Sequence, residues 1–215
     1  MKLHGMIFDM DGTLFDTERQ YIETYHRIAD ERGLDLPHEF TLSCMGLPRE
    51  EVCRKYKKRF GDEFDFYEFR GEMFKRVHKL WDDFGIPLRP GTKELLALCR
   101  DKNIPCAVAT STAKDSAVSM LTRTDIYKYF TAVVGGDEIK NGKPNPDIFI
   151  EAARRIDVPP QKCGGVEDSR NGILAICAAK MTSFLIYDLI KPDDEMISAA
   201  DYIFDSLEKI RDYII

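Results

Sequence analysis

Short apolar runs and longer segments of helical periodicity alternate along most of the chain. The runs show little alternation of polar and apolar residues, which predicts strands buried on both faces of a parallel sheet. The clearest runs are Leu3–Phe8, Ile104–Ala109, Thr131–Val134 and Thr182–Tyr187. Two weaker runs are Lys162–Val166, which contains two glycines, and Asp201–Phe204, which we expect to form an edge strand.

Helical periodicity predicts helices between these runs. The segments are Gly91–Arg100, Pro146–Ile156 and Ser169–Lys180. The resulting β-α-β order predicts an α/β fold with a doubly wound, Rossmann-like parallel sheet and right-handed crossovers.

The segment 17–84 departs from this alternation because it contains no convincing strand. Apolar residues recur at helical spacing from Tyr21 to Ala29, and amphipathic stretches follow in Glu50–Phe60 and Phe66–Phe84. Two prolines, at 87 and 90, then mark a return to the alternating pattern. We therefore expect a small all-α domain, residues 17–86, inserted after the first strand of a core domain formed by residues 1–16 and 87–215.

The composition of the chain speaks against a nucleic acid or a membrane as a partner. A length of 215 residues suits one α/β domain with a small insert, and the net charge of -6 without a basic cluster speaks against nucleic-acid binding. No apolar stretch approaches the roughly 20 residues that cross a bilayer. The six cysteines form no C-x-x-C pair, so we expect buried thiols in a reducing compartment. These features predict a cytoplasmic protein without a membrane partner, and the architecture can work as a monomer.

Two carboxylates directly follow the first predicted strand, in the string FDMDGTL of residues 8–14. Asp9 and Asp11 should therefore lie at the carboxyl end of a strand, where open α/β sheets bind ligands. Two such acids repel each other unless a cation lies between them or one of them is protonated. The alternative is a pair of turn aspartates that only caps the strand.

Three further polar elements follow other predicted strands. Thr110 and Ser111 offer a hydroxyl and backbone N–H groups that can hold a phosphate oxygen. Lys143, in the string GKPNPD of residues 142–147, can neutralise a phosphate from a loop that two prolines constrain. Glu167 and Asp168 supply the hard oxygen ligands that suit Mg²⁺. Taken singly, these elements could instead be helix caps and a solvated lysine.

The four elements occur in the order of the motifs of the haloacid dehalogenase-like hydrolases, and the chain resembles that family along nearly its whole length. The family strings are D-x-D-G-T-[LV], a Thr or Ser ending a buried strand, G-K-P-x-P-[DE], and E-D-S. The string FDMDGTLFDTE of residues 8–18 is similar to that of the β-phosphoglucomutase-like and phosphatase branch. This resemblance implies a Mg²⁺-dependent phosphotransferase.

The resemblance also implies roles for single residues. Asp9 would be the nucleophile that forms a phosphoaspartyl intermediate, and Asp11 the general acid that later serves as general base. Thr110 and Lys143 would hold the phosphoryl oxygens, on which charge develops in the transition state.

The metal site implied by the resemblance uses the same acids. Mg²⁺ would bind the carboxylates of Asp9 and Asp168 and the backbone carbonyl of Asp11. Glu167 would be either a further ligand or a partner in the surrounding shell. The presence of Asp11 argues against the dehalogenase branch, whose members lack the second acid.

In relatives, an insert at this position is a cap that closes over the active site and selects the substrate. The string MGLPRE of residues 45–50 resembles the cap loop that meets the substrate. Gly46 and Arg49 are therefore candidate substrate-binding residues, although Arg49 could equally be an ordinary surface residue. In the core domain, Ser111 and Lys114 are further candidates.

Three positions depart from the mutase-like pattern. Tyr21 stands where mutase-like members carry a histidine, and Thr112 and Ala113 stand where they often carry a lysine or arginine, with Lys114 one place later. Lys180 follows a predicted helix where relatives usually have glycine, at a cost in strain of about 1 kcal/mol. The first two departures favour a phosphatase over a mutase.

The sequence therefore predicts a phosphatase that acts on a small phosphorylated metabolite, such as a sugar or polyol phosphate. The alternative enzyme is a β-phosphoglucomutase-like isomerase. A catalytically idle binding module is a further alternative, but it predicts damage at one of the acids or at Lys143, and all of these are intact.

Overall fold

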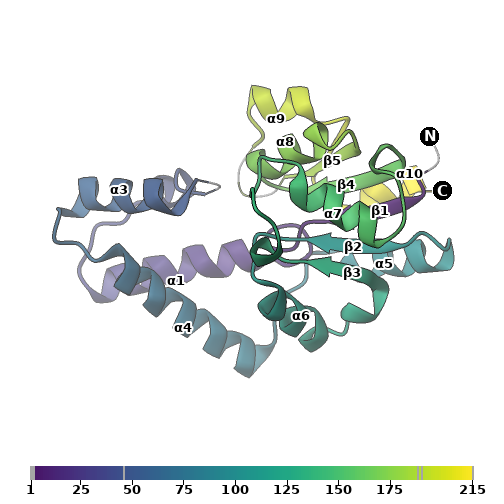
Figure 1. Cartoon of the computed structure of the whole chain (residues 1–215). Coiled ribbons are helices and arrows are strands. Elements are labelled where there is room, and N and C mark those ends of the chain that lie inside the picture. The colour runs from purple at the N-terminus through teal and green to yellow at the C-terminus, as the bar shows by residue number, and fades with distance from the viewer. Residues whose placement is uncertain (1–2, 46, 188, 190, 215) are drawn as a thin grey trace. The chain divides into compact units, whose positions relative to one another are not determined.

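The computed structural model describes residues 3–45, 47–187, 189 and 191–214 (Figure 1). The chain divides into two compact units: Met1–Asp16 with Ile86–Ile215, which we call the sheet unit, and Thr17–Gly85, which we call the helical unit. In the described ranges no helix combines the length and apolar character that a membrane span requires.

The sheet unit is built on six parallel strands in the order β3-β2-β1-β4-β5-β6. Their bounds are β1 Gly5–Phe8, β2 Cys106–Ala109, β3 Phe130–Val134, β4 Cys163–Glu167, β5 Thr182–Ile186 and β6 Tyr202–Phe204. Strands β1, β2, β4 and β5 are buried throughout, which is why their sequences are apolar without alternation. The prediction of a doubly wound, Rossmann-like α/β fold is confirmed.

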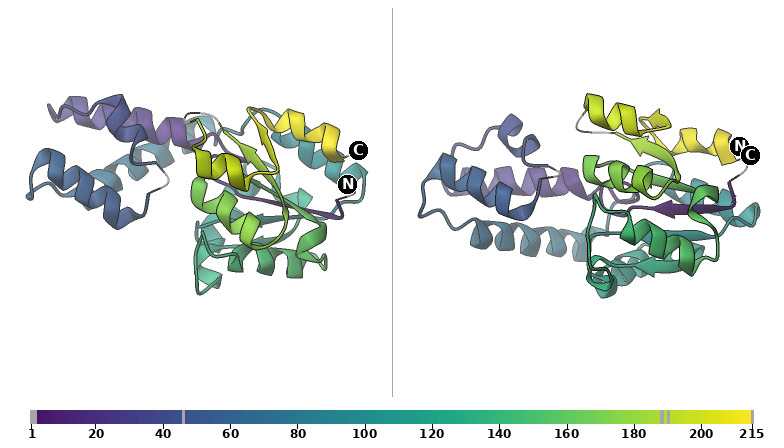
Figure 2. Two further views of the ribbon diagram at one scale, coloured as in Figure 1. Left: turned by 90° about the horizontal axis from the view of Figure 1, so that it is seen from above. Right: turned by 45° about the horizontal axis from the view of Figure 1, so that its top comes forward.

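Helices cover both faces of this sheet (Figures 1 and 2). Their bounds are α5 Thr92–Asp101, α6 Lys114–Arg123, α7 Asp147–Arg155, α8 Arg170–Ala178, α9 Asp194–Ala199 and α10 Arg211–Ile214. Helices α7 and α8 pack on one face, where side chains such as Phe149 and Ile176 form a buried core with residues of β1, β2 and β5. Helices α5 and α10 lie together on the other face.

The two glycines that weaken the prediction of β4 have a packing reason. A Cβ atom on Gly164 would lie 2.7 Å from the sulfur of Met6, and one on Gly165 would lie 2.8 Å from side-chain carbons of Ile176. The glycines therefore let β1 and α8 approach the centre of the sheet closely, and β4 pairs with both β1 and β5.

The helical unit contains α1 Thr17–Glu31, α2 His38–Leu42, α3 Arg49–Phe60 and α4 Phe66–Phe84. Helix α4 buries Phe66, Phe69, Met73, Val77 and Trp81, which recur every three or four residues on one face. The described residues of this unit form no strand, and the short helix α2 was not predicted.

The cysteines differ in part from the expectation of buried thiols. All six are free, and four of them are buried. Cys44 is half-buried and Cys177 is exposed, so the prediction of burial is wrong for these two. Cys177 lies on the solvent side of α8, where the helical period turns it away from the apolar face that packs on the sheet.

Candidate active site

Asp9 lies directly after β1 and continues the sheet by one residue, because its N–H donates to the carbonyl of Val166 in β4 at 2.9 Å. Strand β1 lies between β2 and β4. The strands β2 and β3 therefore extend the sheet on one side of β1, and β4, β5 and β6 extend it on the other. Such a reversal of strand order leaves a crevice at the carboxyl ends of the strands, where open α/β sheets bind their ligands.

Lys143 forms hydrogen bonds with both Asp9 and Glu167. Its Nζ donates to Oδ1 of Asp9 at 2.5 Å and to Oε1 of Glu167 at 2.6 Å, and its side chain is only 7% exposed. The ammonium also lies 5.0 Å from the centre of the Phe149 ring. A buried ammonium held by two carboxylates has a fixed position, which a solvated loop lysine would lack.

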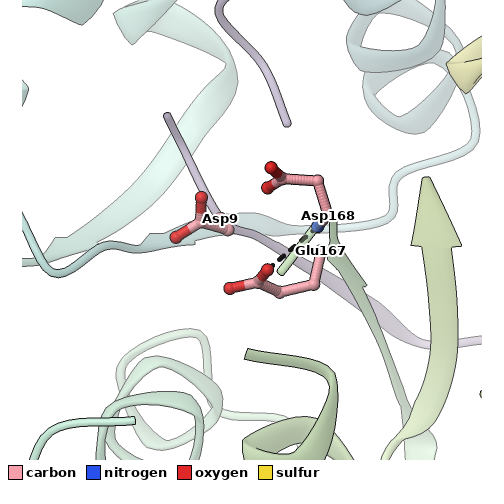
Figure 3. Close-up of side chains that lie close together, drawn as sticks. All are labelled: Asp9, Glu167 and Asp168. Carbon is pink, nitrogen blue, oxygen red and sulfur yellow. Dashed lines mark hydrogen bonds between the residues drawn. The ribbon is translucent and has the colours of Figure 1, made fainter. Parts of the chain in front are cut away.

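Three carboxylates converge beside this lysine (Figure 3). Oxygen atoms of Asp9, Glu167 and Asp168 lie within 4.8 Å of one another at the carboxyl ends of β1 and β4. Carboxylate oxygens at this spacing are a donor set that fits a hard divalent cation such as Mg²⁺. The residues present therefore fit the metal that the family motifs imply.

Glu167 is the most constrained of the three acids. Its Oε2 accepts from the N–H of Asp168 at 2.9 Å, and from the N–H and hydroxyl of Ser169 at 2.7 and 2.9 Å. Its Oε1 accepts from Lys143, and the side chain is 1% exposed. Because both oxygens already have donors, Glu167 is better suited to hold Lys143 than to bind a metal directly.

Burial and neighbouring charges shift the pKa values of Asp9 and Lys143. Burial raises the pKa of Asp9 well above the usual carboxyl value; the charge of Lys143 lowers it, and that of Glu167 raises it. Burial lowers the pKa of Lys143, but the charges of Asp9 and Glu167 outweigh it and hold that pKa above its usual range. Lys143 therefore stays protonated, and a further cation would favour the ionised form of Asp9.

Two threonines that the sequence analysis did not assign to the site orient its acids. The hydroxyl of Thr13 donates to Oδ1 of Asp168 at 2.8 Å, and the hydroxyl of Thr112 donates to Oδ2 of Asp11 at 2.8 Å. Thr13 belongs to the first motif, so its position in the sequence was a usable signal. No such signal marked Thr112, which appears in the sequence only as a departure from the mutase-like pattern.

Thr110 and Ser111 follow β2 at the same edge of the sheet. Thr110 is buried, and its hydroxyl oxygen accepts from the N–H of Thr112 at 3.1 Å, while Ser111 is exposed. Lys114 begins α6, and its ammonium lies 2.9 Å from Oε1 of Glu138. The structure thus links Thr110 to Asp11 through Thr112 and pairs Lys114 with a carboxylate of its own unit.

The remaining candidates belong to the helical unit. Arg49 is the first residue of α3, and it lines a cavity of that unit. Tyr21 lines the same cavity and packs against Phe74, with ring centres 5.5 Å apart. Gly46 lies outside the described residues.

Fold and site together define an α/β enzyme with acids, a hydroxyl and a lysine gathered at the carboxyl edge of its parallel sheet. Residues 6–186 match the family described as haloacid dehalogenase-like hydrolase. The chain belongs to this family, and the resemblance seen in its motifs is confirmed.

The chain is similar to a phosphatase, a phosphoglucomutase and a protein named CbbY. The phosphorylated carbohydrates phosphatase of Thermotoga maritima is 33% identical over 177 residues, which are 82% of each chain. The β-phosphoglucomutase of Bacillus subtilis is 29% identical over 187 residues, 83% of this chain and 81% of that one. A crystal structure of a CbbY variant from Rhodobacter sphaeroides with xylulose 1,5-bisphosphate has a TM-score of 0.76 and 25% identity, covering 97% of this chain and 96% of that one.

Proposed function

We propose that this phosphoric monoester hydrolase removes the phosphoryl group of a sugar or polyol phosphate through a phosphoaspartyl intermediate on Asp9. The observation that carries the proposal is the buried contact of Lys143 with Asp9 and Glu167 at the carboxyl edge of the sheet. The similarity to a phosphorylated carbohydrates phosphatase supports the class of substrate.

In the first half of the reaction, a carboxylate oxygen of Asp9 attacks phosphorus in line with the ester bond. The new bond joins Asp9 to phosphorus, while the bond from phosphorus to the ester oxygen breaks. Asp11 gives its proton to the departing oxygen, so the alcohol leaves neutral. The bond from the Thr112 hydroxyl holds the Asp11 carboxyl group in one orientation for this transfer.

In the second half, water attacks phosphorus and Asp11 accepts the proton that the water loses. The bond between phosphorus and the Asp9 oxygen breaks, which releases inorganic phosphate and restores both acids. Asp11 thus returns to the protonated state in which it began.

Lys143 and Thr110 are proposed to bind the phosphoryl oxygens. The ammonium of Lys143 is fixed beside the nucleophile, so it can stabilise the charge that spreads over these oxygens without further rearrangement. Thr110 is buried at the end of β2 and can present its hydroxyl to one of the same oxygens.

Mg²⁺ is proposed to bind the carboxylates of Asp9 and Asp168 and the backbone carbonyl of Asp11. Bound there, Mg²⁺ would reduce the repulsion between the carboxylate nucleophile and the anionic substrate. The hydroxyl of Thr13 orients Asp168, and Glu167 holds Lys143 in place. Glu167 is therefore assigned to the shell around the metal.

The helical segment 17–86 is proposed to be a cap that selects the substrate. Its support is that Thr17–Gly85 forms a separate compact helical unit, which lies in the sequence between two parts of the sheet unit. Within it, Arg49 and Gly46 are proposed to contact the substrate, while Ser111 and Lys114 contribute from the sheet unit.

The experiment is a screen of sugar and polyol phosphates for phosphate release, with and without Mg²⁺. We expect Asp9→Asn to lower kcat by at least about 10³-fold, because the amide is a poor nucleophile. Asp115→Asn, which changes an exposed acid of the same unit, should leave kcat unchanged. Full activity of Asp9→Asn would contradict the assignment of Asp9 as the nucleophile.

A β-phosphoglucomutase-like isomerase is the second candidate, because a β-phosphoglucomutase is among the similar proteins. Tyr21 and the Thr112-Ala113 pair, where mutase-like members carry basic residues, favour the phosphatase. The two functions are separated by incubation with β-glucose 1-phosphate. Formation of the 6-phosphate with little phosphate release would reverse the ranking.

A further inference from the structure

The chain after Asp9 folds into a compact turn, residues 10–15. The N–H groups of Leu14 and Phe15 both donate to the carbonyl of Met10, at 2.9 and 3.0 Å. The N–H of Gly12 donates to the carbonyl of Phe15 at 3.0 Å. These bonds close the turn on itself, but none of them involves the carbonyl of Gly12.

Gly12 separates two residues whose side chains organise the proposed site. Before it, Asp11 accepts a hydrogen bond from the hydroxyl of Thr112 at 2.8 Å. After it, Thr13 donates to Asp168 at 2.8 Å. Glycine has more backbone freedom than any other residue, so rotation at Gly12 would move both neighbours. A group that fixes the Gly12 carbonyl therefore also fixes the backbone that carries Asp11.

Arg89 supplies such a group from a distant part of the sequence. Its Nη1 donates to the carbonyl of Gly12 at 3.0 Å, across 77 residues. Its backbone N–H donates to the carbonyl of Leu14 at 2.9 Å, and the residue is only 8% exposed. Arg89 and the turn belong to the same unit. Arg89 thus holds two carbonyls of the turn, one through its side chain and one through its backbone.

A guanidinium is a costly donor for a buried carbonyl. Burial of a charged group loses solvation, whereas the hydrogen bond that it donates is stronger than that of a neutral donor. Thr92 provides a comparison, because its hydroxyl donates to the carbonyl of Leu14 at 3.1 Å without burying a charge. The use of arginine at the Gly12 carbonyl therefore favours a role that needs this carbonyl firmly held.

We propose that Arg89 is a positioning residue, which keeps Asp11 oriented toward the departing ester oxygen by holding the carbonyl of Gly12. Arg89 acts through the backbone of the turn. The inference rests on the proposed function, in which Asp11 protonates that oxygen. Its specific consequence is that Arg89 affects the proton transfer more than the attack by Asp9.

The test compares two substrates that differ in their need for this proton. A sugar phosphate needs a proton on its departing oxygen, whereas 2,4-dinitrophenyl phosphate releases a stable phenolate. For both, kcat/KM covers the steps up to departure of that group. We expect Arg89→Met, which keeps a long side chain without donors, to lower kcat/KM for the sugar phosphate about 10²-fold or more. For 2,4-dinitrophenyl phosphate the loss should stay within about threefold.

Asp11→Asn distinguishes a failure of this inference from a failure of the proposed function. It should also lower kcat/KM mainly for the sugar phosphate, and equal losses for both substrates would contradict Asp11 as the general acid. If Asp11→Asn is selective while folded Arg89→Met lowers kcat/KM equally for both substrates, or for neither, Arg89 does not position Asp11.

Thr92→Val is the matched control, because it removes a side-chain bond to the same turn and leaves the bond from Arg89 to Gly12. Its kcat/KM should stay within about threefold of the wild type for both substrates. A selective loss as large as that of Arg89→Met would overturn the proposal, since any weakening of the turn would then suffice.

Arg89→Gln provides a second variant in case Arg89→Met does not fold, as judged by circular dichroism and thermal unfolding. Glutamine is polar, but it is uncharged and shorter than arginine, so we expect the same selective loss for the sugar phosphate. A folded Arg89→Gln protein without this selectivity would overturn the proposal.

Discussion

At the residue scale, Gly12 lies so close to Asp168 that no side chain fits between them. Its φ is +80°, and a Cβ atom on it would lie 2.1 Å from Oδ2 of Asp168. The N–H of Gly12 also donates to the carbonyl of Phe15 at 3.0 Å, which turns the chain away from the site. Glycine is therefore required here for both backbone conformation and space.

Gly12→Ala should move Asp168 and lower kcat/KM by about 10²-fold or more, since displacements near 1 Å have effects of this size. The left-handed backbone should also lower the free energy of unfolding by about 1–2 kcal/mol. Steady-state kinetics and urea unfolding measure the two effects. Gly71→Ala is the control. A Cβ atom added to Gly71 in α4 would have no neighbouring atom within 4 Å, so this substitution should not destabilise the protein. An active Gly12→Ala protein would contradict the assigned position of Asp168.

Lys180 adopts a left-handed backbone conformation that is unfavourable for lysine. It has φ of 59° directly after α8 and its cap residue Ala179, as the sequence analysis expects for this helix end. The other described non-glycine residues with positive φ are Asn103, Asp125 and Asp157, which follow α5, α6 and α7. Asn and Asp tolerate this conformation better than Lys does.

Lys180→Gly should therefore raise the free energy of unfolding by about 1 kcal/mol, because glycine adopts the left-handed conformation without strain. Thermal and urea unfolding measure the gain. Asn103→Gly is the matched control at an equivalent helix end, and its gain should be smaller. A destabilised Lys180→Gly protein would show that the lysine side chain makes a contribution that backbone strain does not explain.

At the element scale, Glu138 joins two helices of the sheet unit. Its carboxylate lies 2.9 Å from the ammonium of Lys114 at the start of α6 and 3.1 Å from the guanidinium of Arg155 at the end of α7. Partial burial raises the pKa of Glu138, but the bonds from Arg155 and Lys114 outweigh this effect and lower it to about 2. The ionised form is therefore more stable in the folded protein than in the unfolded chain.

This shift makes the contribution of Glu138 dependent on pH. The stabilisation is fully present above the ordinary pKa of 4.5 and is lost as the pH falls through about 2. Since the side chain is 23% exposed, solvent screening limits the contribution to about 1 kcal/mol. Glu138→Gln should lower the free energy of unfolding by this amount at pH 7 and by progressively less below pH 4. An equal loss across this pH range would show that charge is not the cause.

At the scale of the whole molecule, the chain combines a unit built on a parallel sheet with a separate helical unit. The sheet unit brings Asp9, Lys143, Glu167 and Asp168 together, and it is here that a bound metal should stabilise the fold. A ligand that binds only the native state raises stability by mass action, by about 2.7 kcal/mol at a hundred times its Kd.

Saturating Mg²⁺ should therefore raise Tm by several degrees, and a chelator should reverse the rise. Asp168→Asn should reduce the shift, because it removes a proposed ligand while keeping the size of the side chain. Asp115→Asn should keep the full shift. Differential scanning fluorimetry measures all three, and an undiminished shift in Asp168→Asn would contradict its place in the metal site.

Much of the sheet unit was predictable from the sequence. Strands buried on both faces must be apolar throughout, so β1, β2, β4 and β5 are visible as short continuous runs. Parallel strands also place their carboxyl ends at one edge of the sheet. The acids and the hydroxyl that end or follow β1, β2 and β4, with the lysine in the loop before α7, were therefore recognisable as one candidate site. The resemblance of their motif strings indicated the family.

Other features arise only in the tertiary structure, because they depend on side chains from distant segments. Thr13 reaches Asp168 across 155 residues of sequence, and Thr112 reaches Asp11 across 101. The saturation of Glu167 by hydrogen bonds from Lys143, Asp168 and Ser169 likewise depends on packing. The sequence by itself determined the sheet and the order of the motifs, since both follow from local pattern, and the resemblance of those motifs to known ones indicated the family. Only the tertiary structure decided which groups hold the acids in place, since this depends on three-dimensional contacts between distant segments.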